Sequence, residues 1–154
     1  MIIAFLHDHP AFVLRLSECC GREWAHLYPD WNADSARREF ENQPGDGTLP
    51  LTLVALEGGE LLGTVSLIVN DLPRFEHFNP WLANLFVLPE HRGESVAGFL
   101  IGAAEERLRA LGYPAGYLFT ESARPLFEKL GWEFVQPAQC LGHPVTILRR
   151  DFQN

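Results

Sequence analysis

The chain has 154 residues, of which 47% are apolar and 21% charged, and its formal net charge is −8 at neutral pH. This length fits one compact domain, residues 1–154, whose core needs neither disulfides nor a structural metal. A protein that binds the phosphate backbone of a nucleic acid needs a basic face, so the negative net charge argues against nucleic acid as a partner. No stretch approaches the roughly 18 uncharged apolar residues of a membrane span, so we expect no membrane partner.

The N-terminal apolar run and the cysteines indicate neither export nor metal binding. Met1–Leu6 meets Asp8 and Pro10 too early to form the core of a signal peptide, and no basic residues precede it. The three cysteines form no CxxC pair, and adjacent Cys19 and Cys20 would point in different directions on a helix. We therefore expect a cytoplasmic protein with no bound metal.

The first elements expected are a strand and two helices. Ile2–Leu6 indicates a short strand, and Pro10 suits the first turn of a helix that reaches about Leu27. Asn32 is a good N-cap for a second helix over Ala33–Asn42, which is rich in helix formers.

A β-hairpin follows. The apolar runs Leu51–Leu56 and Leu61–Val69 flank Gly58-Gly59, a turn signal, so the sheet begins antiparallel. After a polar loop from Asp71 to Asn79, Trp81–Val87 gives a further apolar strand that ends close to Pro89.

The second half of the chain alternates helices with strands. A long helix over Ser95–Leu111 has apolar residues on one side and is closed by Gly112. The later elements are a strand at Tyr117–Thr120, a helix at Arg124–Leu130, and strands at Trp132–Val135 and Val145–Arg150. The long helix connects the strand at Trp81–Val87 to the strand at Tyr117–Thr120, and this connection is predicted to be a parallel, right-handed crossover. The fold class is therefore α/β (α+β), with a mixed, mostly antiparallel sheet flanked by helices.

The segment from Leu85 to Ala97 joins a strand to the long helix through small residues and an arginine. Free N–H groups of a first helical turn point along the axis with the positive dipole end, and small residues let a phosphate approach them. Arg92 can add charge-assisted hydrogen bonds. An ordinary turn, with Gly93 relieving strain and Arg92 solvated, has the same spacing, so both interpretations stay open at this point.

Residues 92–97, Arg-Gly-Glu-Ser-Val-Ala, resemble the cofactor motif of the GCN5-related N-acetyltransferases (GNAT). That motif is Gln/Arg-x-x-Gly-x-Gly/Ala after a strand that ends in Val and often Pro, here Val87 and Pro89. Two positions depart from the family pattern. Ser95 stands where glycine is usual, and Glu94 adds negative charge beside the expected pyrophosphate.

A second segment, residues 123–132, resembles the family's later pattern Ala-x-x-Leu-Tyr-Glu-Lys-Leu-Gly-Phe. The resemblance covers roughly residues 51–135 and leaves the N-terminal helices to the family's variable acceptor side. It implies a GNAT-like sheet, acetyl-CoA as the acyl-donor cosubstrate, and a small-molecule or peptide amine as acceptor, in a monomer or a homodimer.

The resemblance also implies which residues hold the cofactor. The strand end would pair with the pantetheine arm, a backbone N–H near Val87 would serve the oxyanion, and the following turn would hold the pyrophosphate. The implied cofactor-binding residues are Leu85, Phe86, Val87, Arg92, Gly93, Glu94, Ser95, Val96, Ala97, Gly98, Thr120 and Phe127.

The catalytic residues stay unassigned. Direct transfer needs a neutral amine, a stabilised oxyanion and a proton for the thiolate. By the resemblance, Phe127 occupies the usual position of a tyrosine general acid and Thr120 that of an asparagine; phenylalanine donates no proton, whereas water can protonate a thiolate of pKa near 8.5. The candidate bases lie in expected loops or strand edges, where each is more typically a solvated surface group: Glu76, His77, Glu121 and His143.

Two functions therefore remain open. One is an acetyl-CoA-dependent N-acyltransferase. The other is a catalytically weak or inactive module of the same fold that senses acyl-CoA or an amine, motivated by the departures at Ser95, Thr120 and Phe127. Aromatic residues that could line the acceptor pocket, but more often fill a core, are Trp24, Trp31, Phe75, Phe78 and Trp81.

Overall fold

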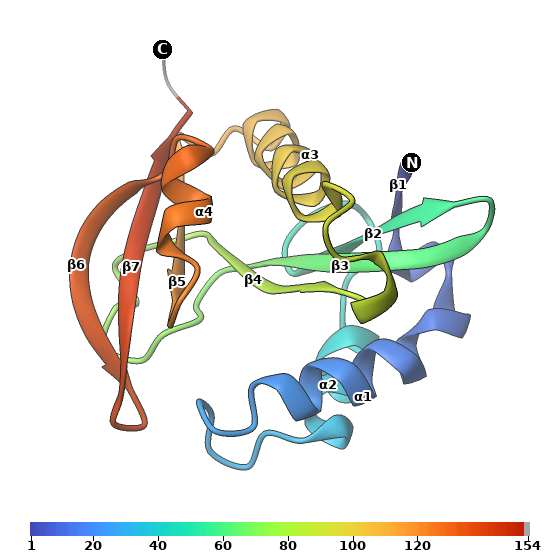
Figure 1. Cartoon of the computed structure of the whole chain (residues 1–154), viewed down its shortest axis with the longest axis horizontal. Helices are drawn as coiled ribbons and strands as arrows, with labels where there is room; N and C mark the ends of the chain where they lie inside the picture. The colour runs from blue at the N-terminus through green and yellow to red at the C-terminus, as the bar shows by residue number, and fades with distance from the viewer. Residues whose placement is uncertain (153–154) are drawn as a thin grey trace.

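A seven-stranded, mostly antiparallel sheet organises the chain, with strand order β1-β2-β3-β4-β5-β7-β6 (Figure 1). The computed structural model describes residues 1–152. The strands are β1 (Ile2–Phe5), β2 (Leu51–Glu57), β3 (Glu60–Ile68), β4 (Trp81–Val87), β5 (Ala115–Thr120), β6 (Glu133–Cys140) and β7 (His143–Asp151). The helices are α1 (Val13–Glu23), α2 (Ala33–Glu41), α3 (Val96–Ala110) and α4 (Arg124–Lys129). This architecture confirms the predicted fold class.

Local sequence signals account for several of these elements. Gly58 and Gly59, with φ of 58° and 83°, make the two-residue turn of the β2–β3 hairpin, because such turns need left-handed residues. The Asn32 side chain accepts a hydrogen bond from the Ser35 N–H at 3.0 Å and caps α2 as predicted. Gly112, with φ of 89°, follows the end of α3.

The predicted bounds of the first helix and of the last two strands were wrong. The first helix ends at Glu23 rather than near Leu27, and its predicted first turn at Pro10 is a separate 3-10 turn. The last two strands, β6 and β7, are longer than the expected Trp132–Val135 and Val145–Arg150, and they include Pro137 and Pro144. Pro137 fits within β6, an edge strand of the sheet, where a missing N–H donor is tolerated.

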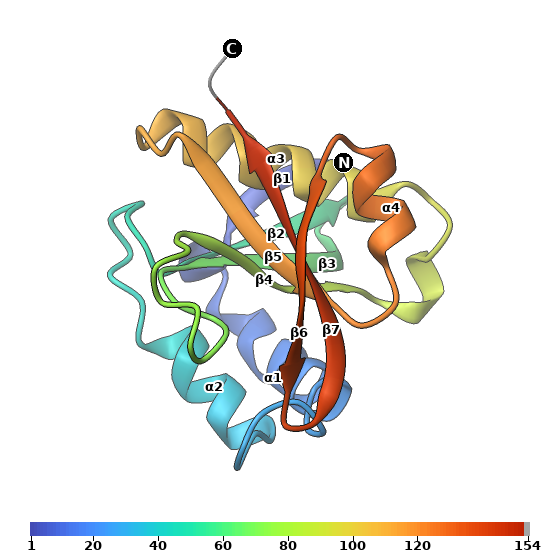
Figure 2. The same cartoon turned by 90° about the vertical axis from the view of Figure 1, so that its left-hand side faces the viewer.

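The parallel pair β4 and β5 carries the main irregularity of the sheet. The two strands pair in parallel, as predicted, but only at Trp81 and Tyr117, where β4 begins. Beyond that point β5 continues against β7, and β4 continues against β3. Figures 1 and 2 show β5, β7 and β6 running steeply across the direction of β2, β3 and β4. The sheet is therefore split between the C-terminal halves of β4 and β5.

Both faces of the sheet are covered by helices, and the apolar core lies beneath them (Figure 1). Under α3 and α4 the core includes Leu100, Leu118 and Leu148, and under α1 and α2 it includes Leu16 and Phe40. Each such side chain contributes about 1.5–3 kcal/mol through its burial. Within residues 1–152, no helix is both long and apolar enough to cross a membrane.

Candidate functional site

The split between β4 and β5 opens a cavity of about 390 Å³. Its walls come from β4, β5, the segment after α1, the first turn of α3 and the start of α4. The β5-facing backbone groups of β4 beyond Trp81 have no strand partner in the described part of the chain. Those groups are consequently available to an extended ligand lying along β4.

A β-bulge shapes the β4 wall. Phe86 lies opposite Thr64 and Ala83 opposite Ser66, so three steps along β4 match two along β3. Asn84, inside the bulge, has φ of 53°, a left-handed conformation that asparagine adopts more readily than most residues. Bulges re-aim the backbone next to binding sites, and this one turns the β4 backbone where it borders the cavity.

Side chains under β4 hold the bulge in place. The Asn84 amide donates to Ser66 Oγ at 3.2 Å and to Glu39 Oε1 at 3.4 Å. Ser66 Oγ is in turn 2.8 Å from Thr52 Oγ1, which accepts from the Gln43 amide at 2.8 Å. These hydrogen bonds connect α2, β2 and β3 to the bulge, so buried and partly buried polar contacts hold the cavity wall in place.

The turn between β4 and α3 contains two left-handed residues. Gly93 has φ of 84° and Ser95 has φ of 65°; glycine adopts this region freely, whereas another L-residue pays roughly 1–2 kcal/mol. The helical hydrogen bonding of α3 begins with the Phe99 N–H donating to the Ser95 carbonyl. The preceding N–H groups, from Val96 to Gly98, lie at the positive end of the helix, which suits an anion.

The Arg92 side chain folds back over the end of β4. Its Nε–H donates to the Val87 carbonyl at 3.0 Å, and its guanidinium carbon is 5.3 Å from the Phe86 ring centroid. Arg92 also lines the cavity. The guanidinium therefore secures the strand end while its remaining N–H groups stay available to an anion.

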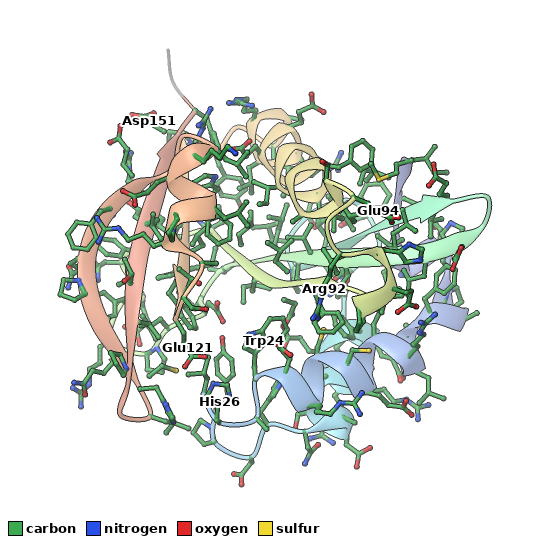
Figure 3. All side chains as sticks on the ribbon, in the orientation of Figure 1. Trp24, His26, Arg92, Glu94, Glu121 and Asp151 are labelled. Carbon is green, nitrogen blue, oxygen red and sulfur yellow. The ribbon has the colours of Figure 1, made fainter. Side chains whose placement is uncertain are left out.

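The Glu94 carboxylate is held by a neighbouring histidine. Glu94 Oε1 is 3.0 Å from His91 Nδ1, and His91 Nε2 is 3.2 Å from Glu60 Oε1 in the β2–β3 hairpin. Figure 3 shows Glu94 on the hairpin side of the turn, apart from Arg92. The hydrogen bond with Glu94 is the main cause that raises the pKa of His91. When His91 is protonated, its positive charge offsets the negative charge of Glu94.

The opposite wall of the cavity, formed by β5 and α4, carries two further positions that depart from the family pattern, Thr120 and Phe127. Thr120 Oγ1 accepts a hydrogen bond from the Ala123 N–H at 3.0 Å, which leaves its own O–H proton free to donate. Phe127 is only 6% exposed and packs edge-on against Trp132, with ring centroids 6.3 Å apart. This wall therefore offers a hydroxyl at Thr120 and an apolar ring at Phe127.

Polar and aromatic side chains gather at the α1 side of the cavity. The Tyr28 hydroxyl donates to Asp71 Oδ1 at 2.7 Å, and burial raises the pKa of Asp71 to about 7. Trp24 lies between Arg92 and Glu121 (Figure 3). Three carboxylates, on Glu23, Asp71 and Glu121, line the cavity.

The structure gathers part of the implied cofactor set around this cavity. The cofactor residues that line it are Leu85, Phe86, Val87, Arg92, Ala97, Thr120 and Phe127. Gly93, Glu94 and Ser95 form the exposed turn beside it, and the side chain of Val96, the first residue of α3, is buried in the apolar core. Gly98 borders a different groove, between α3 and β1.

Only some of the candidate bases and of the aromatic residues suggested for the acceptor pocket line the cavity. Glu121 and Trp24 line the cavity. Glu76 and His77 are exposed in the β3–β4 loop, and His143 is exposed at the β6–β7 turn. The other aromatics lie among or against apolar core clusters, which favours a packing role: Trp31, Phe75, Phe78 and Trp81.

Sequence reasoning missed Glu23, Tyr28 and Asp71, all of which line the cavity. No spacing pattern joins them, because they come from the end of α1, the following turn and the β3–β4 loop. The available signal was weak: Asp71 begins a polar loop directly after an apolar strand.

Comparisons with known proteins identify the family and the fold of the chain. The model of the GNAT acetyltransferase family matches residues 15–132. An aminoglycoside 6'-N-acetyltransferase complexed with coenzyme A has a similar structure, with a TM-score of 0.77, 20% identity, and coverage of 100% of this chain and 98% of that chain.

Two further structures share the fold. One is yncA of Salmonella typhimurium, assigned as an acetyltransferase, with its cofactor acetyl-CoA (TM-score 0.74, 17% identity, 99% of this chain and 94% of that chain). The other is a ribosomal-protein-alanine N-acetyltransferase from Brucella melitensis (TM-score 0.73, 17% identity, 99% and 100%). These identities are low, so the likeness shows the fold alone. Comparison with curated protein sequences gave no match.

Proposed function

The chain belongs to the GNAT acetyltransferase family, and from that premise we propose that it moves the acetyl group of acetyl-CoA directly onto the amine of a small molecule or peptide. One observation carries the proposal. β4 and β5 part after a single paired position, and the cavity between them adjoins a helix N-terminus with free N–H groups.

The residues around the cavity fit the cosubstrate. The β5-facing backbone of β4, bent by the bulge at Asn84, offers N–H and C=O groups to the amides of the pantetheine arm. The turn at Gly93 and Ser95 presents the first N–H groups of α3 to a pyrophosphate. Bound there, acetyl-CoA supplies an activated acyl group as a thioester.

Preorganised donors would then assist the transfer. A backbone N–H at the end of β4, near Val87, can stabilise the negative charge that develops on the acyl oxygen, because a fixed donor needs no reorganisation as the charge forms. The bulge and the Arg92 hydrogen bond to the Val87 carbonyl hold this strand end in place. The acceptor would enter from the side of Trp24 and Tyr28, opposite the α3 turn.

Acceptor-dependent release of the CoA thiol tests the proposal. The purified protein is incubated with acetyl-CoA and a panel of polyamines, aminoglycosides, amino acids and peptide N-termini, and the thiol is measured with a chromogenic disulfide. We expect at least one amine to stimulate release and to gain one acetyl group by mass spectrometry. Ala97→Glu, which places a carboxylate in the cavity at the start of α3, should abolish release, whereas Ala110→Glu at the exposed end of the same helix should retain it.

A second candidate function, acyl-CoA binding without turnover, is favoured by one observation. Phe127, buried against Trp132 in the cavity wall, supplies no proton for the departing sulfur. Binding of acetyl-CoA with no thiol release on any amine of the panel would support this sensor module and contradict the transferase.

A further inference from the structure

Asp71 lines the cavity on the side of Trp24 and Tyr28, from which we propose that the acceptor enters; we call this side the acceptor half. It follows β3 in the loop that leads to β4, and its neighbour Leu72 is 2% exposed, in an apolar core cluster that includes Trp81. The Tyr28 hydroxyl donates to Asp71 Oδ1 at 2.7 Å. The second carboxylate oxygen, Oδ2, takes no part in this hydrogen bond. Asp71 lines the same cavity as the end of β4.

We propose that Asp71 is the general base of the acetyl transfer, positioned by Tyr28, and that it takes the proton from the ammonium form of the acceptor. The inference rests on the proposed function and names a residue for one of its steps. Tyr28 is a positioning residue here, because it acts through Asp71.

The acetyl transfer needs a general base that deprotonates the acceptor. An aliphatic amine with a pKa near 10.4 is neutral in only about one molecule in 2,500 at neutral pH, so the nucleophile must first lose a proton. Two N–H protons leave the acceptor nitrogen: the first passes to Asp71 and on to solvent, and the second ends on the departing sulfur. The C–N bond forms as the C–S bond breaks, and an ammonium ion and a thioester give an amide, a thiol and one released proton.

The surroundings of Asp71 suit this role better than those of Glu121, another carboxylate that lines the cavity. Burial raises its pKa, the Tyr28 hydrogen bond lowers it, and Glu39 on α2 raises it. Cys140 on β6 also faces it. A base whose pKa is close to the working pH is ionised in a substantial fraction of the molecules and still attracts a proton.

Glu121, in contrast, is exposed and already pairs with His26, whose Nε2 lies 2.7 Å from Glu121 Oε1. This partly exposed pair connects the segment after α1 to the segment after β5. Glu121 therefore serves as a matched control, since Glu121→Gln removes one negative charge from the same cavity without touching the Tyr28–Asp71 hydrogen bond.

The first test is the pH dependence of kcat/KM for the best amine of the panel, at saturating acetyl-CoA. The wild-type rate should rise with pH and level off near pH 7. In Asp71→Asn the rate at neutral pH should fall by roughly 100-fold, and the plateau should give way to a continuing rise toward the pKa of the free amine. In Glu121→Gln the plateau near pH 7 should persist.

Tyr28→Phe distinguishes a base from a merely structural carboxylate. Loss of the hydroxyl donor destabilises the ionised form of Asp71, so the rising limb should move to higher pH. An unchanged limb in Tyr28→Phe, or a plateau near pH 7 retained in Asp71→Asn, would overturn the proposal while leaving the transferase function intact. Absence of turnover on every amine would instead overturn the function itself.

The second readout needs no turnover. Carbon-detected NMR of the protein without acetyl-CoA should show one aspartate carboxyl resonance that titrates near pH 7, is missing in Asp71→Asn and shifts to higher pH in Tyr28→Phe. A resonance assigned to Asp71 that titrates near the ordinary aspartate pKa of about 4 would contradict the proposal.

Discussion

Replacement of Arg92 by alanine separates two roles for its guanidinium. The structure shows one role directly, in the hydrogen bond from Nε to the Val87 carbonyl at 3.0 Å and the placement over the Phe86 ring. An exposed hydrogen bond of this kind contributes about 1 kcal/mol and an exposed cation–π contact about 0.5–1 kcal/mol. Arg92→Ala should therefore lower stability by about 1.5–2 kcal/mol, or Tm by roughly 3–8 °C.

The second role would be direct contact with a phosphate of CoA. If the free N–H groups of Arg92 make that contact, Arg92→Ala should also weaken CoA binding by about 1.5–3 kcal/mol, which is roughly a 10- to 150-fold increase in Kd. Isothermal titration calorimetry with CoA and urea unfolding of the same samples measure the two effects separately.

Arg92→Lys is the matched control. Lysine keeps the positive charge but lacks the planar fork that reaches the Val87 carbonyl, so it should recover most of the CoA affinity and little of the stability. Arg92→Ala with an unchanged Kd and a lowered Tm would refute the phosphate role and leave Arg92 as an anchor for the end of β4.

Three further changes probe the turn and the opposite wall. Ser95→Gly removes the left-handed strain at φ 65°, so calorimetry should give an equal or lower Kd for CoA; a Kd more than about tenfold higher would mean that the serine hydroxyl is a ligand. Glu94→Gln removes the main cause that raises the pKa of His91, so the His91 titration followed by NMR should move to lower pH; an unchanged pKa would contradict the contact. Phe127→Tyr should raise turnover by less than about 100-fold with CoA affinity unchanged; lower turnover together with a lower Tm would show that Phe127 leaves no room for a hydroxyl.

The local elements could be predicted from the sequence because their signals are contiguous. Gly58-Gly59 between two apolar runs specifies the hairpin, Asn32 caps α2, and the apolar run Trp81–Val87 coincides with β4. The strands β6 and β7 extend beyond their predicted bounds and include Pro137 and Pro144. Proline is tolerated at such positions only through the place of the strand in the sheet, which the local sequence does not show.

The proposed donor half of the site could be predicted from the sequence, whereas the proposed acceptor half could not. The β4–α3 turn occupies one short segment, so a motif could indicate it. Tyr28 and Asp71 are separated by 43 residues and meet only after α1 packs beside the sheet. The bulge at Asn84 depends on register against β3, and no spacing pattern predicts it. Tertiary packing, rather than any local propensity, creates the acceptor half.

Calorimetric titration of the folded wild-type protein with acetyl-CoA tests the central claim most directly, because every proposal for the cavity depends on that ligand. We expect one binding site per chain with a Kd in the range of about 1 μM to 1 mM, and loss of the binding heat in Ala97→Glu but not in Ala110→Glu. A wild-type protein that unfolds cooperatively, yet shows neither binding heat nor a rise in Tm at millimolar acetyl-CoA, would contradict the account.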